Sequence, residues 1–571
     1  MVSTRFGRAC RGGPPRGKLC RMDAIATQRP VISGVIFDFD GTLTDGGTLD
    51  FRQVRQELAV PPETPILEHI ASRTDPEERR RIEEVLLDHE RRAADLSRPR
   101  PGAEALVTEL RARGAAVGIL TRNTRDALTR SFRNFETLTA EDFHSVVTRD
   151  DTHAYKPSPA GVYAIAESWG IDPRQIALVG DYRDDVTAAL AAGCYAVYLA
   201  PPVAPEGRAR DARAHFNAQG VAEVRAHLLE MLALPVGKVP PELLREILAP
   251  AGTTADESLV GGPAIGVDTG AFAPPAGELT VVTSDPITFP TENPARYLTT
   301  INVNDLVTTG ARPRWCSVNL LFPPGSAPFQ VRHLAAELHD ALHEHGIALI
   351  GGHSEVTDGV SRLVVSMTLM GSVPREDFRK PSAVRPGDTI IMTKSAGIEG
   401  TAILAAERRE ELLAGGVDEE TLRRACRFID RISVRPEAEA LATRPAVRWL
   451  HDVTEGGVAT ALRELAQASG WCVEVDPTAI PVAPETRAVC AALGVDPRGL
   501  IGSGALLAAI APDALEEIRA AVSPLPVTLS VLGTVLSESA TEDTAPELPA
   551  RSSVTGEILP VFPRDEIARI L

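Results

Sequence analysis

Short apolar strands alternate with helical stretches between Val31 and Leu199, and this alternation constrains the fold more than any other feature. The expected strands cover residues 31–37, 116–121, 145–148, 176–180 and 195–199. Strands that are separated by helices usually pair in parallel, because the helix returns the chain to the edge where the strand began. We therefore predict a parallel α/β sheet for the first third of the chain.

A strongly charged, helix-forming stretch at residues 50–98 interrupts this alternation. It predicts a helical cap inserted into the domain at about residues 46–100, and a run of Pro and Arg at 98–101 ends it. Apolar residues at helical spacing then predict a helix from Ala103 to Leu110, and residues 221–234 predict a closing helix.

The length of 571 residues is too great for one hydrophobic core, so several domains are expected. We place the first domain at 29–234 and a Pro- and Gly-containing linker at 235–240. A turn at Pro386-Gly387-Asp388 divides the remainder into 241–385 and 386–571. Residues 1–28 are rich in Arg and are expected to form a disordered basic leader, with a transit-like leader or a start at Met22 as alternatives.

Charge and composition exclude several classes of function. The formal net charge of -18 opposes binding to nucleic acid phosphates. No apolar run approaches the ~20 residues that span a membrane. The scattered cysteines form no CxxC pair, which argues against a zinc site and for a reducing compartment. A cytoplasmic protein is expected.

Two carboxylates, Asp38 and Asp40, follow the first expected strand directly. Residues two apart in extended chain share a face, so both project from the carboxyl end of the strand, where open α/β sheets bind ligands. Neighbouring carboxylates repel each other unless a cation lies between them, which favours Mg²⁺ over zinc. One carboxylate can attack phosphorus while the other protonates the leaving alcohol. Gly41 allows the chain to turn away from the site.

Further polar residues follow the later strands in a consistent order. Thr121 ends the second strand, Lys156 lies in Tyr155-Lys156-Pro157, and Asp181 with Asp185 follows the fourth strand. Each has an ordinary structural interpretation when taken alone, as a helix cap, a solvated charge or a turn residue. Together with the first pair they predict a phosphotransfer site that contains a hydroxyl, a cation and additional metal-binding carboxylates.

This order of motifs resembles the four signature motifs of the haloacid dehalogenase (HAD) superfamily, over about residues 31–230. The position of the insertion is similar to the cap of the phosphoglycolate phosphatase-like branch. The resemblance implies a Mg²⁺-dependent phosphatase acting on a small phosphorylated metabolite, with Asp38 as nucleophile and Asp40 as general acid and base. It implies metal binding by Asp38, Asp181 and the Asp40 carbonyl, supported by Asp185. It also implies phosphate contacts from Thr121, Asn123 and Lys156.

Acidic residues beside glycines recur in the second half, where we expect them at strand ends: Asp268, Asp285, Asp305, Glu355 and Asp452. Acids with flexible neighbours suit Mg²⁺ bridging a polyphosphate, and Gly456-Gly457 at a helix start can present amides to an anion. No GxxxxGK[ST] motif is present. From spacing alone, a set of turn glycines and capping acids remains an equal alternative.

The order of residues within these motifs favours a nucleotide-binding site. The segments NVNDLVTTGARP (302–313), GGHSEV (351–356) and HDVTEGGVATAL (451–462) resemble the AIR synthase (PurM-like) superfamily, nearest to its HypE branch. The resemblance implies a module of two α+β subdomains that forms a homodimer and uses Mg-ATP to phosphorylate an oxygen. The residues it implies for ATP and metal are Asp268, Asp285, Asn304, Asp305, Glu355 and Asp452.

The sequence also departs from relatives within that superfamily. It ends in Arg569-Ile570-Leu571, without the terminal Cys of HypE, so the carbamoyl-to-nitrile chemistry is not carried over. It also lacks the early Cys of selenophosphate synthetases.

The leading hypothesis is a bifunctional enzyme, with a phosphatase fused to an ATP-using domain. A HypE-like maturation factor that binds a partner protein, with the first half as an accessory, is the alternative. A third possibility is that the second half only dimerises the phosphatase.

Overall fold

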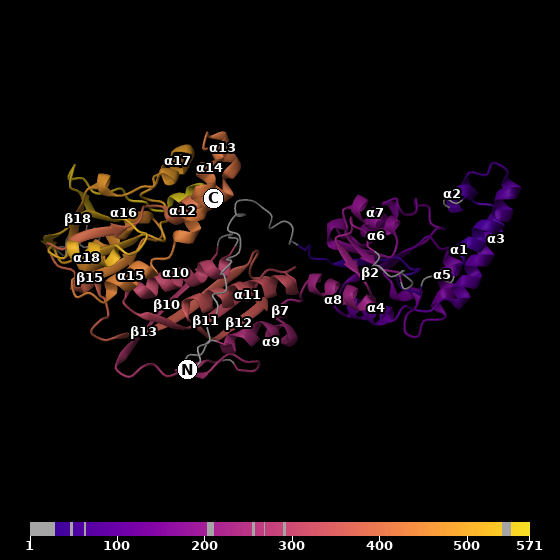
Figure 1. The fold of residues 1–571 in the computed structure, drawn as a ribbon, viewed down its shortest axis with the longest axis horizontal. Helices are drawn as coiled ribbons and strands as arrows, with labels where there is room; N and C mark the ends of the chain where they lie inside the picture. The colour runs from indigo at the N-terminus through magenta and orange to yellow at the C-terminus, as the bar shows by residue number, and fades with distance from the viewer. Residues whose placement is uncertain are drawn as a thin grey trace, which may run out of the picture. The chain divides into compact units, whose positions relative to one another are not determined.

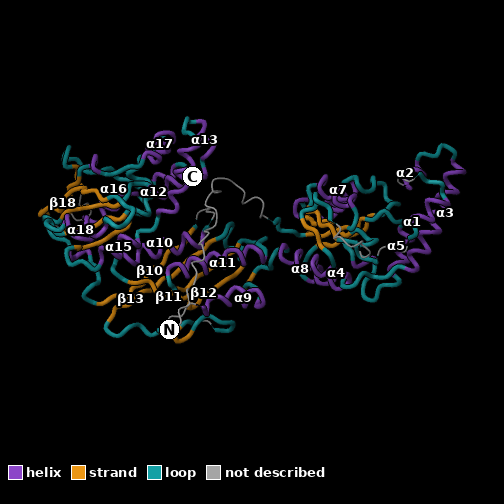
Figure 2. The backbone as a smooth tube through the Cα atoms, in the orientation of Figure 1, coloured by secondary structure: helices purple, strands orange, loops and turns teal. Residues whose placement is uncertain are grey.

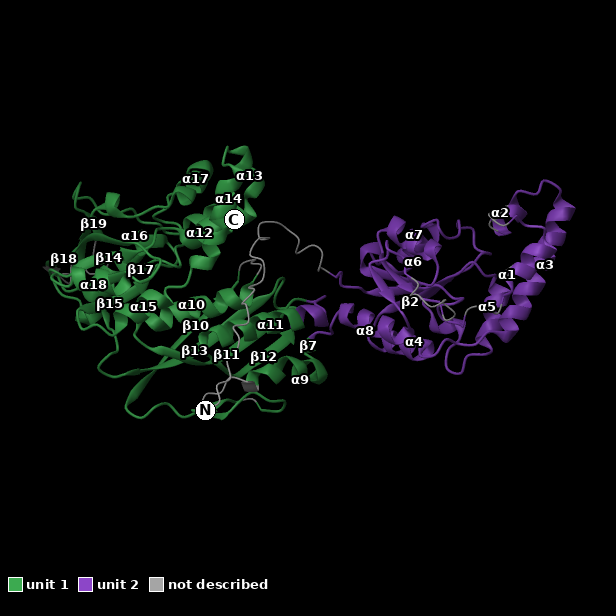
Figure 3. Ribbon diagram, in the orientation of Figure 1, with its two compact units in different colours: residues 1–27, 237–323, 332–571 green, residues 28–236, 324–331 purple. Residues whose placement is uncertain are grey.

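The computed structural model describes residues 29–45, 49–61, 64, 66–201, 210–253, 257–267, 269–288, 293–539 and 550–571. The chain divides into two compact units (Figure 3). The N-terminal unit comprises Gln28–Val236 with Pro324–Val331, and the C-terminal unit comprises Gly237–Pro323 with Arg332–Leu571. No helix in these ranges combines the length and apolar character that a membrane span requires.

The N-terminal unit contains a six-stranded sheet in the order β3-β2-β1-β4-β5-β6. Every pairing in it is parallel, so the predicted parallel α/β sheet is confirmed. The strands are β1 (Gly34–Phe37), β2 (Ala116–Leu120), β3 (Ser145–Val147), β4 (Ile176–Gly180), β5 (Tyr195–Leu199) and β6 (Phe216–Ala218). The helices that connect them are α4 (Ala103–Ala112), α5 (Arg125–Phe132), α6 (Ala160–Trp169), α7 (Arg183–Ala192) and α8 (Val221–Met231).

Both faces of this sheet are buried, which explains why its strands are apolar at consecutive positions. Val35 and Phe37 point into the core formed with α4, α5 and α8. Ile36, between them, points into the core formed with α6 and α7. Figure 2 shows the orange strands between these two sets of helices. The layered arrangement leaves the carboxyl ends of the strands open for a site.

Trp169, the last residue of α6, lies across two strands at glycine positions. A Cβ atom at Gly34 of β1 or at Gly118 of β2 would meet its indole ring at 2.7 Å, closer than packed atoms approach. The side-chain-free positions therefore create the space that the ring fills.

The predicted cap region contains three helices, α1 (Phe51–Glu57), α2 (Ile66–Ala71) and α3 (Pro76–Leu96). Helix α3 begins where the Asp75 carboxylate accepts a hydrogen bond from the Glu77 amide, with Pro76 in the first turn. Its apolar positions Ile82 and Leu86 pack in a small core with α1 and α2. The C-terminal half of α3 packs on α5 of the main domain (Figure 1).

The C-terminal unit begins with a five-stranded sheet in the order β10-β13-β11-β12-β7. The strands are β7 (Gly237–Lys238), β10 (Glu278–Ile287), β11 (Arg312–Phe322), β12 (Ala348–Val356) and β13 (Val364–Pro374). The helices are α9 (Pro241–Leu248), α10 (Pro294–Thr308) and α11 (Pro328–His345). A separate hairpin pairs β8 (Leu259–Gly261) with β9 (Ala271–Phe272). Strand β7 lies inside the stretch predicted as a linker.

A second six-stranded sheet completes this unit, in the order β15-β17-β14-β18-β16-β19. Its strands are β14 (Thr389–Thr393), β15 (Val447–Asp452), β16 (Trp471–Val475), β17 (Leu506–Ile510), β18 (Leu529–Ser539) and β19 (Ala550–Ser552). The helices are α12 (Ile398–Glu407), α13 (Arg409–Ala414), α14 (Glu419–Cys426), α15 (Arg435–Ala442), α16 (Gly457–Ser469), α17 (Pro484–Leu493) and α18 (Leu515–Val522). Helix α10 packs against β15 and α15, which joins the two sheets of the unit.

Candidate active sites

Asp38 stands at the carboxyl end of β1, where its backbone amide donates to the Val179 carbonyl of β4 at 2.8 Å. Lys156 reaches the same place, and its side chain is 3 % exposed. The Lys156 ammonium forms ion pairs with the Asp38 carboxylate and with Asp185 Oδ1, the latter at 2.6 Å. A buried cation is thus held directly between two buried carboxylates.

Asp181 completes a cluster with these acids. One carboxylate oxygen from each of Asp38, Asp181 and Asp185 lies within 4.8 Å of the others. Hard oxygen donors at this spacing suit Mg²⁺, so the residues present fit the metal that the fold family implies. Two glycines leave room for the cluster: a Cβ at Gly41, where φ is +77°, would collide with Asp181, and a Cβ at Gly180 would collide with Asp185.

Burial and repulsion between the acids raise the pKa values of Asp38 and Asp181 in this cluster. Burial is the largest cause that raises the pKa of Asp38, and Asp185 and Asp181 add to it while Lys156 opposes it. Burial and Asp185 raise the pKa of Asp181 to about 7. Burial alone would lower the pKa of Lys156, but Asp185 and Asp38 outweigh it, and that pKa is raised. The site therefore carries more negative charge than Lys156 balances, and a divalent cation would neutralise the excess.

Asp40, the second acid of the motif, is held apart from the cluster. Burial is the largest cause and raises the pKa of its carboxyl, and an interaction with the Asn123 side chain opposes that rise. Asn123 is itself fixed by its backbone amide, which donates to Thr121 Oγ1 at 3.1 Å. Thr121 is buried at the end of β2, where its amide donates to the Val147 carbonyl at 3.0 Å. The structure thus brings the predicted residues of the first half to one edge of the sheet.

Arg100 belongs to this site but was not predicted from the sequence. Its guanidinium donates to the carbonyl of Gly41 at 2.5 Å and to that of Ala200 at 2.7 Å, and the residue is 7 % exposed. It links the loop after Asp38 to the chain just beyond β5. Arg100 lies in the Pro and Arg run that we interpreted only as the end of the cap, and no spacing signal distinguishes it there.

The C-terminal unit contains a second group of acids. Thr283 Oγ1 donates to Asp305 Oδ2 at 2.9 Å. Burial, Asp452 and Asp285 raise the pKa of Asp305 to about 8. Burial also raises the pKa of Asp452, whose Oδ2 atom has no hydrogen-bond partner among the residues that the structure describes. An orphaned buried carboxylate oxygen beside two further acids fits a bound cation. The predicted Asp268 lies outside the described residues.

The expectation that these acids stand at strand ends was partly wrong. Asp285 lies within β10, which continues to Ile287, and Asp305 lies on helix α10. Glu355 lies within β12, where His353 Nε2 approaches its Oε2 at 3.1 Å. Asp452 does end β15, as expected. Asp285, Asp305 and Asp452 lie near one another because α10 packs on β10 and β15, a tertiary contact that the local sequence does not reveal.

Asn304 is directed away from this group. Its amide nitrogen donates to the Ile432 carbonyl at 2.7 Å, and its amide oxygen accepts from the Val434 amide at 2.9 Å. The residue is fully buried. Both functional atoms of Asn304 thus hold the backbone at 432–434, and its role in ATP binding stays a prediction.

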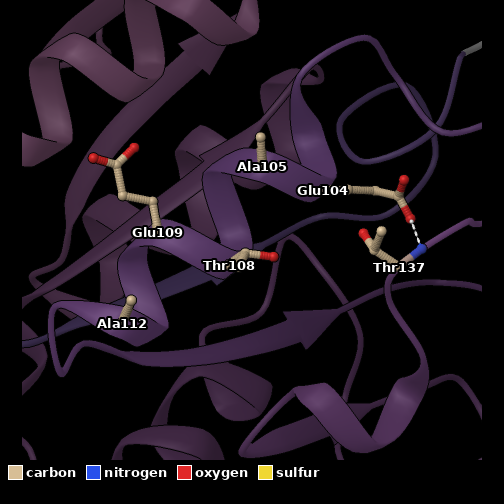
Figure 4. A pocket seen from close by; sticks show the side chains of 6 residues that line it. All are labelled: Glu104, Ala105, Thr108, Glu109, Ala112 and Thr137. Atoms are coloured by element: carbon tan, nitrogen blue, oxygen red, sulfur yellow. Dashed lines mark hydrogen bonds between the residues drawn. The ribbon is translucent and has the colours of Figure 1, made fainter.

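A surface depression of about 520 Å³ lies elsewhere on the N-terminal unit, along α4 (Figure 4). Its acidic side chains are already engaged. Glu104 accepts a hydrogen bond from the Thr137 amide at 3.0 Å, and Glu109 pairs with Arg225 at 2.5 Å. None of the residues of the Asp38 cluster lines it, so it contributes nothing to the chemistry described above.

Comparison with known families agrees with the two-part organisation. A model of the haloacid dehalogenase-like hydrolases matches residues 32–193. Models of the N-terminal and C-terminal domains of AIR synthase related proteins match residues 266–373 and 385–544. Both resemblances inferred from the motifs are confirmed, as is the fold class.

Individual relatives match the second half. The carbamoyl dehydratase HypE of Cupriavidus necator is 30% identical over 272 residues, which cover 46% of this chain and 74% of that protein. The HypE of Rhodobacter capsulatus is 30% identical over 246 residues, covering 42% of this chain and 68% of that protein. A crystal structure of E. coli HypE aligns at 23% identity and a TM-score of 0.48, over 57% of this chain and 100% of that one. This chain therefore belongs to the HypE family of AIR synthase related proteins through its second half, and it carries a haloacid dehalogenase-like hydrolase domain in its first.

Proposed function

We propose that the N-terminal unit is a Mg²⁺-dependent phosphatase that hydrolyses a small phosphomonoester through an aspartyl-phosphate on Asp38. The observation that carries this proposal is the buried arrangement of Asp38 with Lys156, Asp181 and Asp185 at the open edge of a parallel sheet. A purely structural ion pair would need one acid for one cation. Here Lys156 pairs with two of three clustered carboxylates, Asp38 and Asp185, and the negative charge left over suits a metal and a reacting phosphoryl group.

The roles of the side chains follow from their positions. A carboxylate oxygen of Asp38 attacks phosphorus, and the bond to the leaving oxygen breaks as Asp40 transfers a proton to that oxygen. Asp40 then takes a proton from the water that attacks the acyl-phosphate. Inorganic phosphate leaves, Asp38 returns to its carboxylate form, and Asp40 returns to its protonated form. Lys156 and Thr121 hold phosphoryl oxygens, and Asn123 orients Asp40 through the interaction of their side chains.

Asp38, Asp181 and Asp185 would hold Mg²⁺, together with the backbone carbonyl of Asp40. When bound, the ion neutralises negative charge on the phosphoryl oxygens and on the cluster. Arg100 supports this loop from behind through the Gly41 carbonyl.

The test is phosphate release from a panel of phosphomonoesters, with the full chain, Mg²⁺ and the variant Asp38→Asn. We expect Asp38→Asn to lose turnover by at least about a thousandfold, because no other group can form the acyl-phosphate. Asp88→Asn is the matched control, since Asp88 is an exposed cap carboxylate paired with Arg92, and it should retain full activity. Turnover that persists in Asp38→Asn, or that survives complete chelation of divalent ions, would remove the proposal.

For the C-terminal unit we propose use of Mg-ATP to phosphorylate an oxygen of a second substrate. Membership of the HypE family supports this, together with the buried acids Asp285, Asp305 and Asp452. Asp268, which lies outside the described residues, is part of the proposal through the motif resemblance alone. ATP binding should depend on Mg²⁺ and weaken at least tenfold in Asp305→Ala, while Asp340→Ala, at an exposed site on α11, should bind normally. Equal affinity for all three chains would contradict the assignment.

We further propose that this unit forms a homodimer. Strand β10 is an edge strand, and Val282 on it is 57 % exposed. Val260 and Val267, which precede it, are also exposed apolar residues. A second copy of the chain would cover such apolar side chains. Sedimentation of the full chain at micromolar concentration should give a dimer, and Val282→Glu should shift it toward monomer.

The alternative is a maturation factor that binds a partner protein, with the first unit as an accessory. It predicts no Asp38-dependent turnover on small phosphoesters. The phosphate-release panel therefore separates the two functions directly.

A further inference from the structure

One ion pair between the cap and the main domain differs from its neighbours by being buried. Glu90 on α3 and Arg149, which follows β3, meet through two parallel contacts of 2.6 and 2.8 Å. Their side chains are 8 % and 15 % exposed. Two-point pairing between a carboxylate and a planar guanidinium fixes orientation as well as distance, and burial protects it from screening by salt.

The other ion pairs that join α3 to the main domain lie in solvent. Arg91 pairs with Asp126 at 2.7 Å, but both side chains are about half exposed, at 48% and 47%. Asp95 pairs with Arg130 at 3.4 Å, with exposures of 52% and 31%. Exposed pairs of this kind contribute at most about 1 kcal/mol. Among the described ion pairs between α3 and the main domain, the Glu90–Arg149 pair is therefore the one that fixes the position of α3 relative to the segment after β3.

Arg149 is also attached to the catalytic loops on its other side. Its backbone amide donates to the Asn123 carbonyl at 2.9 Å. The Asn123 side chain in turn interacts with the Asp40 carboxyl, and Glu90 acts on that carboxyl electrostatically. A continuous set of contacts therefore runs from the cap helix to the acid that must meet the leaving group.

The segment that carries Arg149 has little freedom to shift by itself. The Thr148 amide and hydroxyl both bind Asp151 Oδ2, at 2.7 and 3.0 Å. The Arg125 amide binds Asp150 Oδ2 at 2.8 Å, so the loop after β3 is tied to the loop after β2. A displacement of the Arg149 side chain is thus transmitted to the backbone beside Asn123.

We propose that Glu90 and Arg149 are positioning residues of the phosphatase reaction, which hold the Asn123 loop, and through it Asp40, in place whenever the cap covers the site. This inference rests on the proposed phosphatase function. It assigns a catalytic purpose to a cap residue that makes no contact with the phosphoryl group. Glu90 sits in a helix dense with charged residues, which explains why the sequence does not single it out.

The experiment uses two esters whose alcohols differ in their need for a proton, p-nitrophenyl phosphate and β-glycerophosphate. The nitrophenolate leaves readily without protonation, whereas the glycerol oxygen requires the acid Asp40. We compare kcat/KM, which reports the steps up to formation of the acyl-phosphate, in the full chain with Mg²⁺. The variants are Glu90→Gln, Arg149→Met, the exchanged pair Glu90→Arg with Arg149→Glu, and Arg91→Met as the exposed control.

We expect Glu90→Gln and Arg149→Met to lose roughly 10- to 100-fold on β-glycerophosphate and less than about threefold on p-nitrophenyl phosphate, since general acid catalysis contributes about 10²–10⁴-fold. The exchanged pair should recover most of the loss, and Arg91→Met should resemble the unaltered chain. A pair that only stabilises the fold would lower the melting temperature and reduce both rates equally, and that result would overturn the inference. Unchanged rates on both esters would overturn it too.

Failure of the underlying proposal has a different signature. If the unaltered chain shows no turnover that Asp38→Asn abolishes, the phosphatase function itself is wrong and the inference falls with it. If Asp38→Asn abolishes turnover while the Glu90 and Arg149 variants behave like Arg91→Met, only the inference is wrong.

Discussion

Replacing Lys156 by Met should destabilise the N-terminal unit far more than the loss of an ordinary lysine. The ammonium is 3 % exposed and contacts both Asp38 and Asp185. Met fills a similar volume without the charge, so the variant isolates the electrostatic contribution. Without the cation, the buried acids of the cluster face one another with no compensating charge.

The expected magnitude is about 3–5 kcal/mol at pH 8 in the absence of divalent metal, the usual cost of leaving buried charge unpaired. For a unit of this size, that corresponds to a fall in melting temperature of roughly 6–20 °C. The cost should depend on pH. The pKa of Asp38 is already raised in the folded chain, and removing Lys156 raises it further, so the unfolded chain ionises at lower pH than the folded one. Relative to the unaltered chain, the penalty therefore grows as pH rises through the raised Asp38 pKa of that chain, so it is smaller at pH 5 than at pH 8.

The assay is amide hydrogen exchange of β1 and β4 in the full chain, which reports the unfolding free energy of this unit alone. Measurements at pH 5 and pH 8, with and without Mg²⁺, define the pH and metal dependence after correction for the intrinsic exchange rates. The double variant Lys156→Met with Asp185→Asn serves as the control, because it restores the balance of charge. It should recover more than half of the loss, and Mg²⁺ should partly rescue the single variant.

A loss below about 1 kcal/mol at pH 8, or an equal loss at both pH values, would refute this account. It would mean that the acids are neutral or solvated in the folded chain. The same result would weaken the case for a metal at the cluster.

Three further predictions follow from the same contacts. Asp181→Asn should stabilise the metal-free unit at pH 8, because burial and Asp185 hold the pKa of Asp181 at about 7, and it should abolish the rise in melting temperature on adding Mg²⁺. Gly41→Ala should reduce phosphate release at least tenfold, since φ is +77° and the new Cβ would collide with Asp181; Gly114→Ala, at φ +82° with open space around it, should be fully active. Glu399→Gln should remove a pH dependence from the stability of the C-terminal unit. Burial raises the Glu399 pKa from 4.5 to about 7, so the unaltered unit loses about 3 kcal/mol of unfolding free energy as pH rises between those values. Urea unfolding of both chains at pH 5 and pH 8 measures this loss.

The sequence was most informative where strands run parallel and end at one edge. Strands β4 and β5 begin and end where the apolar runs predicted, because both faces of each strand are buried. In such a sheet, a polar residue at the end of an apolar run must point toward the common edge. That rule is why Asp38, Thr121 and Asp181 could be assigned to one place from spacing alone.

The same rule failed in the C-terminal unit for a physical reason. Its sheets are largely antiparallel, and its acids meet through a helix that crosses between elements. Helix α10 carries buried residues on nearly every side, so its sequence has no amphipathic stripe to reveal which face meets β10. Asn304 illustrates the difficulty, since it adjoins Asp305 in sequence yet faces the backbone at 432–434.

Buried long polar side chains were the other feature that the sequence did not allow us to predict. Arg100, Glu90 and Arg149 lie in charged or Pro-rich stretches of the sequence. Their burial arises from contacts with segments between about fifty and a hundred positions away along the chain. Local composition therefore does not predict such contacts.

The indole that spans Gly34 and Gly118 provides a built-in optical label. Trp169 is the tryptophan of the N-terminal unit, while Trp315, Trp449 and Trp471 belong to the other. With those three replaced by Phe, the emission of the chain would report whether the sheet beneath that ring remains assembled. Ligand titrations and melting of the hydrolase portion could then be followed in the intact fusion, without cutting it apart.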